Sequence, residues 1–342
     1  MPAMRTIDTH AHILSDETMR LINEEAPKLA ATLQDTKADP TILTVAGVAY
    51  HPFPRGGWDI EKRLADMDAA GVDVQLLSAT PQTYYYNQDA AAGETLSALQ
   101  NEQIAKHVKD KPDRFMGIAT LPMQAPEKAA AELRRAIREL GLRGAMIGSN
   151  CEGRNLDDPS FEPLWQAASE LDAFMFIHPV SVAGSDRIKD YYLRNFIGNP
   201  LDTTIAAGCL VFGGVLERFP NLTIVLAHGG GFVPYQMGRW VHGWKERHPE
   251  PQVKLKVSPQ ASLDRLRFDT ILHSRMQLES MIGWVGAPRV LMGTDYPYDM
   301  AMMDPVRHVR SLSIPKADQD IILSTEAEKL LAKPARHATK KA

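Results

Sequence analysis

The sequence has few cysteines, no long uncharged apolar run and only a small excess of charge, and each scarcity excludes a class of protein. With only Cys151 and Cys209 among 342 residues, we expect no disulfide framework and no cysteine-based zinc site, and a reducing, cytoplasmic setting fits. No window approaches the roughly 18 apolar residues of a membrane span, and the first residues do not resemble a signal peptide, so we expect neither membrane insertion nor export. The net charge of -4 argues against nucleic-acid binding and favours small-molecule chemistry.

Apolar runs typical of strands alternate with helical segments along most of the chain. We expect strands that start near residues 6, 72, 115, 142, 173, 222, 266 and 289, with helices over 58–70, 93–108, 126–140, 163–171 and 200–219. Eight parallel strands with crossover helices close into a (β/α)8 barrel of roughly 250 residues. The expected fold is therefore α/β, a TIM-like barrel in a single domain over residues 1–332. The alternative, an open doubly wound sheet, lacks the G-x-G-x-x-G turn after an early strand.

Two segments do not follow this alternation. Residues 13–57 are long, contain prolines and look irregular, with a short helix expected over 16–31, and a segment of this length inside a barrel is typical of a lid or insertion over the site. The end of the chain, residues 333–342, is basic and poor in large apolar residues, and we expect it to be frayed.

Metal-binding side chains stand at the ends of four expected strands: His10 and His12 in TIDTHAH, His178 in FMFIHP, His228 in LTIVLAHGGG and Asp295 in RVLMGTDYP. The two-residue period of a strand points His10 and His12 to the same side, and a barrel collects the carboxyl ends of its strands at one mouth. Taken singly, His178 could be a core histidine, Asp295 a turn residue and His228 only the end of its strand. Together they favour a metal site, and three imidazoles with one carboxylate suit Zn²⁺ with a position left for water.

These motifs, in this order, resemble the amidohydrolase superfamily from about residue 7 to residue 298. More narrowly, WDIEKRLADMDAAGVDVQLLSATP, GGVLERFPNLTIVLAHGGG, PYQMGR and LMGTDYP resemble its aminocarboxymuconate-semialdehyde decarboxylase branch. The resemblance implies a carbon–carbon lyase on a barrel. The characteristic enzymes of the branch have a tryptophan two residues after the strand histidine, whereas this chain has Val180, so the substrate itself does not follow from the resemblance.

The resemblance also implies roles for single residues. It makes His10, His12, His178 and Asp295 the metal ligands, with Asp295 also catalytic, and it makes His228 an acid or base beside the metal. It further implies that Arg55 and Arg239 hold the substrate carboxylate, with Arg239 reaching into the neighbouring subunit of a homodimer. Members with two metals bridge them by a lysine on the fourth strand, and residues 142–150 contain none, so we expect one divalent ion per chain, zinc or alternatively manganese.

We therefore expect a metal-dependent, non-oxidative decarboxylase of a small unsaturated or aromatic carboxylate. The alternative is a metal-dependent hydrolase of a lactone or cyclic amide, in which water is the nucleophile. A non-catalytic binding protein on the same barrel is disfavoured, because every expected metal position is filled. Weaker candidates near the mouth are Cys151, His273 and the run Tyr84 to Tyr86, which either lines a pocket or packs a loop.

Overall fold

The computed structural model describes residues 4–332 apart from residues 35 and 248, and all eight expected strands are present in two parallel sheets. The first sheet has the order β1-β5-β6, formed by Ile7–Ile13, Val74–Ala79 and Phe115–Gly117. The second has the order β13-β12-β11-β10-β7, formed by Val290–Leu291, Arg267–Asp269, Thr223–Leu226, Phe174–His178 and Gly144–Gly148. The predicted α/β class with parallel strands is confirmed.

Two isolated bridges connect these sheets. Ala11 of β1 bridges to Tyr296, which follows β13, and Ala119, which follows β6, bridges to Ala145 of β7. Both bridges are parallel, as are the pairs within each sheet. The carboxyl ends of the strands therefore face the same side of the molecule, which is the arrangement that the candidate site needs.

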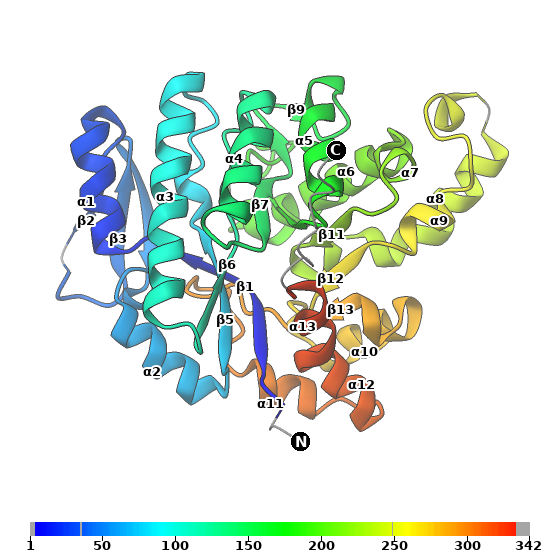
Figure 1. Cartoon of the computed structure of the whole chain (residues 1–342). Coiled ribbons are helices and arrows are strands. Elements are labelled where there is room, and N and C mark those ends of the chain that lie inside the picture. The colour runs from blue at the N-terminus through cyan, green and yellow to red at the C-terminus, as the bar shows by residue number, and fades with distance from the viewer. Residues whose placement is uncertain (1–3, 35, 248, 333–342) are drawn as a thin grey trace, which may run out of the picture.

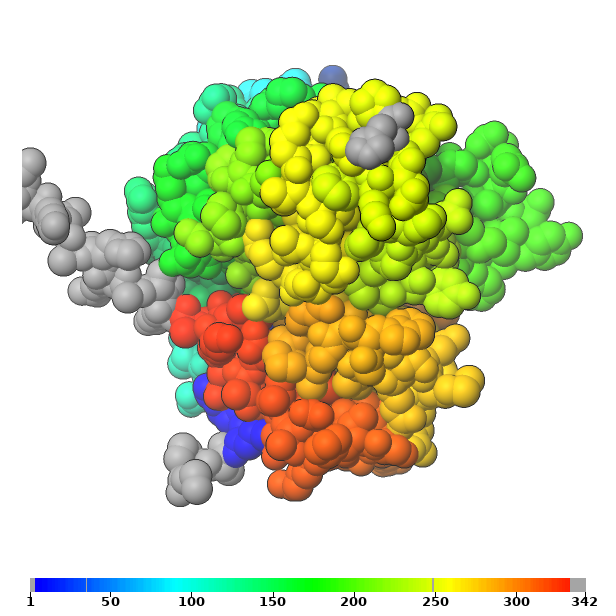
Figure 2. Space-filling view, turned by 90° about the vertical axis from the view of Figure 1, so that its right-hand side faces the viewer, coloured from blue at the N-terminus to red at the C-terminus, as the bar shows by residue number. Residues whose placement is uncertain are grey.

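Helices surround the strands and connect them (Figure 1). The longer ones are α2 (Ile60–Ala70), α3 (Ala90–Asp110), α4 (Pro126–Arg138), α5 (Glu162–Glu170), α6 (Asn199–Phe212), α8 (Val233–Glu246) and α10 (Arg275–Val285). The short helices are α7 (Val215–Arg218), α9 (Gln260–Leu263), α11 (Pro305–Arg310), α12 (Lys316–Asp320) and α13 (Glu326–Leu330). Figure 2 shows the face formed by the last third of the chain, with yellow residues packed above orange and red ones.

Helix α2 illustrates how local signals set the boundaries of these helices. The carboxylate of Asp59 accepts hydrogen bonds from the N–H groups of Glu61 and Lys62 at 3.0 and 3.1 Å, which satisfies donors that the first turn leaves unpaired. Gly71 ends the helix with φ of 70°, a left-handed conformation that glycine adopts without steric cost. The predicted helix over 58–70 is thus confirmed, with its expected terminal glycine.

The helix expected over 200–219 is wrong as a single element, because the chain forms α6 and α7 with a break at Gly213 and Gly214. A Cβ atom on Gly213 would lie 2.3 Å from the Cβ of Asp157, and Gly214 has φ of 70°. The chain passes too close to its neighbours at this point for a continuous helix with side chains. The apolar pattern of the sequence continues across the break, so the pattern alone does not predict where α6 ends and α7 begins.

The expectation of an irregular segment over 13–57 is also wrong. After α1 (Asp16–Glu25), an antiparallel sheet of order β2-β3-β4 forms from Ala31–Gln34, Thr41–Val45 and Val48–Phe53. Pro52 argued against a strand because it cannot donate to a ladder, but β4 is an edge strand, where proline is tolerated. In Figure 1 the blue segment of residues 13–57, called the insertion below, lies beside α3.

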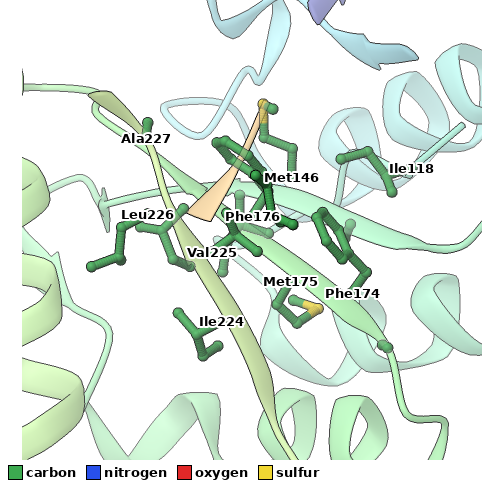
Figure 3. Close-up of a cluster of buried hydrophobic side chains, with 14 of the residues drawn as sticks. Ile118, Met146, Phe174, Met175, Phe176, Ile224, Val225, Leu226 and Ala227 are labelled. Atoms are coloured by element: carbon green, nitrogen blue, oxygen red, sulfur yellow. The ribbon is translucent and has the colours of Figure 1, made fainter. Parts of the chain in front are cut away.

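Two hydrophobic cores hold these parts together. In the main core, apolar side chains of β7, β10 and β11 pack with Ile118 and with the surrounding helices (Figure 3). A second, smaller core includes Leu14, Ile22, Leu43 and Phe53 of the insertion, and Tyr85 and Leu96 complete it from outside the insertion. The insertion is therefore packed against the rest of the molecule through the loop after β5 and helix α3.

Two expectations about the whole chain remain. None of the described helices is long and apolar enough to cross a membrane. The basic segment 333–342, expected to be frayed, lies outside the described residues.

Candidate metal centre and its cavity

Strand β1 presents two buried imidazoles to one point. The Nε2 atoms of His10 and His12 lie 3.1 Å apart, and both side chains are fully buried. The Nδ1 of His10 donates to a carboxylate oxygen of Asp269 at 2.7 Å, so its Nε2 is the nitrogen left to face a cation. The Nδ1 of His12 faces the carbonyl of Ala79 at 3.4 Å, which favours the same tautomer. Both rings therefore aim a donor atom at the space between them.

Asp295, which follows β13, brings its carboxylate to the same point. Its Oδ1 lies 3.1 Å from the Nε2 of His12, 3.3 Å from that of His10 and 3.9 Å from that of His178. The residue has φ of 61°, a left-handed conformation that aspartate tolerates better than most residues. Strained conformations of this kind persist where the surrounding structure enforces them, as at functional sites.

His178 ends β10 with one nitrogen satisfied and one not. Its Nδ1 donates to the carbonyl of Pro179 at 3.1 Å, as a core histidine would. Its Nε2, however, is buried and has no hydrogen-bond partner among the described residues. Buried polar atoms nearly always have a partner, so this lone pair is suited to coordinate a metal ion.

His228 follows β11 and meets the other oxygen of Asp295. Its Nε2 lies 3.2 Å from Oδ2 and, facing a carboxylate, carries a proton. Its backbone N–H donates to Asp269 at 2.8 Å, and the N–H of Gly229 donates to the same carboxylate at 2.7 Å. The Nε2 of His228 thus presents a hydrogen atom, whereas the Nε2 of His178 presents a lone pair.

The donor atoms of four groups, His10, His178, His228 and Asp295, all lie within 4.8 Å of one another, and His12 lies 3.1 Å from both His10 and Asp295. Nitrogen or oxygen ligands about 2.1 Å from one ion would be separated by roughly 3.0–3.4 Å, so the shortest separations suit a shared cation. The structure thus brings together all five side chains that the sequence placed at the strand ends.

The protonation of these groups follows from burial and from neighbouring charge. Burial lowers the pKa of His12 to about 4 and that of His178 to about 3, so both rings are neutral near pH 7 and able to act as ligands. Burial opposes the charged form of His10 as well, but the carboxylates of Asp295 and Asp269 raise its pKa to about 10, so this ring must release its Nε2 proton when a cation binds. Burial alone would raise the pKa of Asp295, yet His10 and its other histidine partners hold it well below its ordinary value.

A buried polar network holds β1 in place behind the site. Asp8 accepts hydrogen bonds from Gln75 at 2.8 Å and from the Thr294 hydroxyl at 2.6 Å. Arg63 donates to Gln75 at 2.6 Å and also to the carbonyl of His12. Asp8, the first residue of the D-x-H-x-H motif, therefore fixes the strand end and does not itself face the metal centre.

The centre opens into a cavity of about 590 Å³, large enough for a substituted aromatic ring. His178, His228 and Asp295 form one end of it. Its other lining residues are mainly aromatic or polar and include Tyr50 of the insertion, Tyr84, Tyr85, Tyr86, Val180, Tyr192, Arg194 and Tyr298. The run Tyr84 to Tyr86 thus lines a pocket, one of the two possibilities that the sequence left open. A second cavity of about 340 Å³ shares His228 and Asp295 and is also lined by His273.

With this geometry in view, comparison with known proteins is informative. Residues 7–333 match the family model described as amidohydrolase. This chain belongs to the amidohydrolase family. The 2-amino-3-carboxymuconate-6-semialdehyde decarboxylase of Dictyostelium discoideum is 34% identical over 306 residues, which cover 90% of this chain and 85% of that protein. The family and the branch predicted from the motifs are confirmed.

Solved structures of other amidohydrolase-fold enzymes agree. The 5-carboxyvanillate decarboxylase from Sphingomonas paucimobilis matches with a TM-score of 0.83 and 26% identity, covering 97% of this chain and 100% of that one. A dihydroxybenzoic acid decarboxylase from Polaromonas sp., solved with bound manganese and the inhibitor 2-nitroresorcinol, matches with a TM-score of 0.79 and 25% identity, covering 96% and 97%. Both similarities extend over nearly the whole chain.

Neither arginine that the amidohydrolase motifs implied lines the described cavities. Arg55 forms an ion pair with Asp59 at 2.7 Å, and its side chain is half exposed. Arg239 lies exposed on α8. Cys151 is buried and is not among the lining residues of either cavity. The roles of Arg55 and Arg239 therefore stay predictions.

The sequence did not identify Asp269, which contacts both His10 and the backbone at His228. The seventh strand was expected to extend over 265–273 and to end at His273, whereas β12 is only Arg267–Asp269. A carboxylate inside the apolar run LRFDTIL was the available signal, since an unpaired charge is rarely buried.

Proposed function

We propose that this chain is a metal-dependent, non-oxidative decarboxylase of a small aromatic or unsaturated carboxylate. The observation that carries the proposal is the convergence of four imidazoles and one carboxylate, with the buried and unpartnered Nε2 of His178, beside a cavity of 590 Å³. The names of the relatives, all decarboxylases among those described above, favour loss of CO₂ over hydrolysis.

We assign His10, His12, His178 and Asp295 as the metal ligands and His228 as the proton carrier. Support comes from the two oxygens of Asp295, because three imidazoles approach Oδ1 whereas His228 approaches Oδ2. The ring nitrogens agree with this division. His178 presents a lone pair at Nε2, and His228 presents a hydrogen atom there.

The reaction breaks the bond between the ring or alkene carbon and the carboxylate, releases CO₂ and adds a proton to that carbon. A bound divalent ion supplies Lewis-acid stabilisation of the charge that develops. His228, held through its backbone by Asp269 and through its ring by Asp295, delivers this proton from Nε2 as an imidazolium and is left as the neutral ring. The aromatic side chains of the cavity wall offer faces on which the substrate ring can stack beside that proton.

Several finer features belong to the same proposal. The metal is one zinc ion per chain, with manganese as the alternative. The two parallel sheets form one closed (β/α)8 barrel in a single domain over 1–332, in which residues 13–57 act as a lid. The enzyme is a cytoplasmic homodimer, and Arg55 and Arg239 contact the substrate carboxylate.

The test is to incubate metal-loaded protein with a panel of aromatic and muconate-like acids and to measure both released CO₂ and ring-opened products. Release of CO₂ without ring opening is expected. Ring opening without CO₂ would instead support the hydrolase of a lactone or cyclic amide.

A further inference from the structure

The cavity contains one guanidinium group that is available to an anion. Within the described part of the chain, Arg194 is the only lysine or arginine among the lining side chains. Its side chain is exposed, and no hydrogen bond or ion pair joins its guanidinium to another described residue. A cationic side chain that lines a cavity and has no such partner is suited to a ligand.

Arg194 belongs to a segment that is fixed at the cavity. The segment leaves β10 just after His178 and continues into α6 through a single π-helical turn, Arg194–Gly198. Two residues before Arg194, the hydroxyl of Tyr192 donates to the carboxylate of Asp299, with both oxygens 3.0 Å away. This bond ties the segment to the loop after β13, so that Arg194 is held near the same opening as the metal centre.

The charges around Arg194 leave it free for substrate. Burial raises the pKa of the Tyr50 hydroxyl, and the positive charge of Arg194, which lines the same cavity, offsets part of this rise. The cavity also contains Glu152 and Asp299, but neither forms an ion pair with Arg194 among the described residues, and Asp299 already accepts from Tyr192.

We propose that Arg194 binds a second acidic group of the substrate, so that the preferred substrates are aromatic or unsaturated acids with two anionic groups. This assignment rests on the proposed function, in which the reacting carboxylate lies at the histidine cluster. A guanidinium forms two parallel hydrogen bonds with a carboxylate, which gives both affinity and orientation. Arg194 would thereby hold the far end of the substrate and fix which carbon faces His228.

The test compares two ligands of nearly equal shape that differ by one charge, isophthalate and its monoamide. Their affinities for metal-loaded protein are measured by calorimetry, which needs no turnover. Wild-type protein should prefer isophthalate by about 10- to 100-fold, the range for a charge-assisted hydrogen bond. Arg194→Gln should abolish this preference, and Arg194→Lys should retain part of it.

Arg187→Gln is the matched control, because Arg187 is exposed in the same segment but does not line either cavity. It should keep the full preference, and all variants should retain the metal content of the parent. A preference that survives in Arg194→Gln, or that is missing from the wild type, overturns the assignment. Failure of the wild type to release CO₂ from any acid overturns the proposed function instead, and the binding comparison still decides the role of Arg194.

Discussion

At the scale of single residues, Asp295 divides its two oxygens between two tasks. Oδ1 faces the nitrogens of His10, His12 and His178, whereas Oδ2 faces His228. Loss of a ligand and loss of the proton carrier should therefore have different consequences, although the side chains touch.

His228→Ala should retain the metal and lose about 10² to 10⁴ in kcat, the range for loss of a general acid or base. His178→Ala should lose both the metal and the activity, because it removes one of the side chains that bind the metal. Elemental analysis after dialysis, together with the rate of CO₂ release, separates the two outcomes. Equal metal loss in both variants would refute the role given to His228.

Asp269→Asn should weaken metal binding by about 10- to 100-fold, the usual effect of losing the partner that orients a histidine ligand. The substitution keeps the shape of the side chain but removes the negative charge of the carboxylate that accepts the hydrogen bond from Nδ1 of His10. Competition with a chelator measures the affinity. Asp264→Asn, an exposed site, is the control, and an unchanged affinity in Asp269→Asn would contradict the positioning role.

At the scale of elements, the sequence predicted the parallel strands and most of their ends, but not the antiparallel sheet within residues 13–57. Each parallel strand is a short, buried, nearly uncharged run, and a metal-binding residue at its end stands out. In the insertion, strands such as Thr41–Val45 alternate weakly and depend on contacts with Tyr85 and Leu96, which are distant in sequence. Strand formation here depends on such tertiary contacts, which produce no recognisable pattern in the local sequence.

Helix α3 permits a test of pH dependence through His107 in its last turn. Burial lowers the pKa of His107, and the charge of Arg63 lowers it further. The unfolded chain takes up a proton near pH 6.5 while the folded chain resists it, so stability falls as the pH drops through this value. His107→Gln should lose less free energy of unfolding than the parent between about pH 7 and pH 5 in urea titrations. Equal losses would contradict this cause.

At the scale of the whole molecule, α8 and α10 expose apolar side chains on a common face. Tyr235 is 76% exposed and Trp284 53% exposed, and their ring centroids are 6.2 Å apart. Arg239 follows Tyr235 by four residues and therefore shares its side of α8. This face supports the proposed homodimer, in which Arg239 would serve the partner's cavity.

Homodimers of Arg239→Ala and of His228→Ala should each be nearly inactive. Co-refolding the two should restore roughly a quarter of the parental activity, because half of the randomly formed dimers are mixed and one of their two sites receives both intact residues. Differently tagged chains allow the mixed dimers to be isolated and assayed. No recovery in isolated mixed dimers would show that Arg239 serves its own chain or no site.

The separate core of the insertion has a consequence for how this scaffold can acquire new specificities. The catalytic groups stand on strand ends, whereas part of the cavity wall comes from β4 of the insertion, which packs in the smaller core together with Tyr85 and Leu96. Changes at Val48 and Tyr50 can alter the wall without disturbing the ligand geometry. Substitutions in the insertion can therefore change which substrates the cavity accepts, while the metal-binding and proton-transfer residues at the strand ends stay the same.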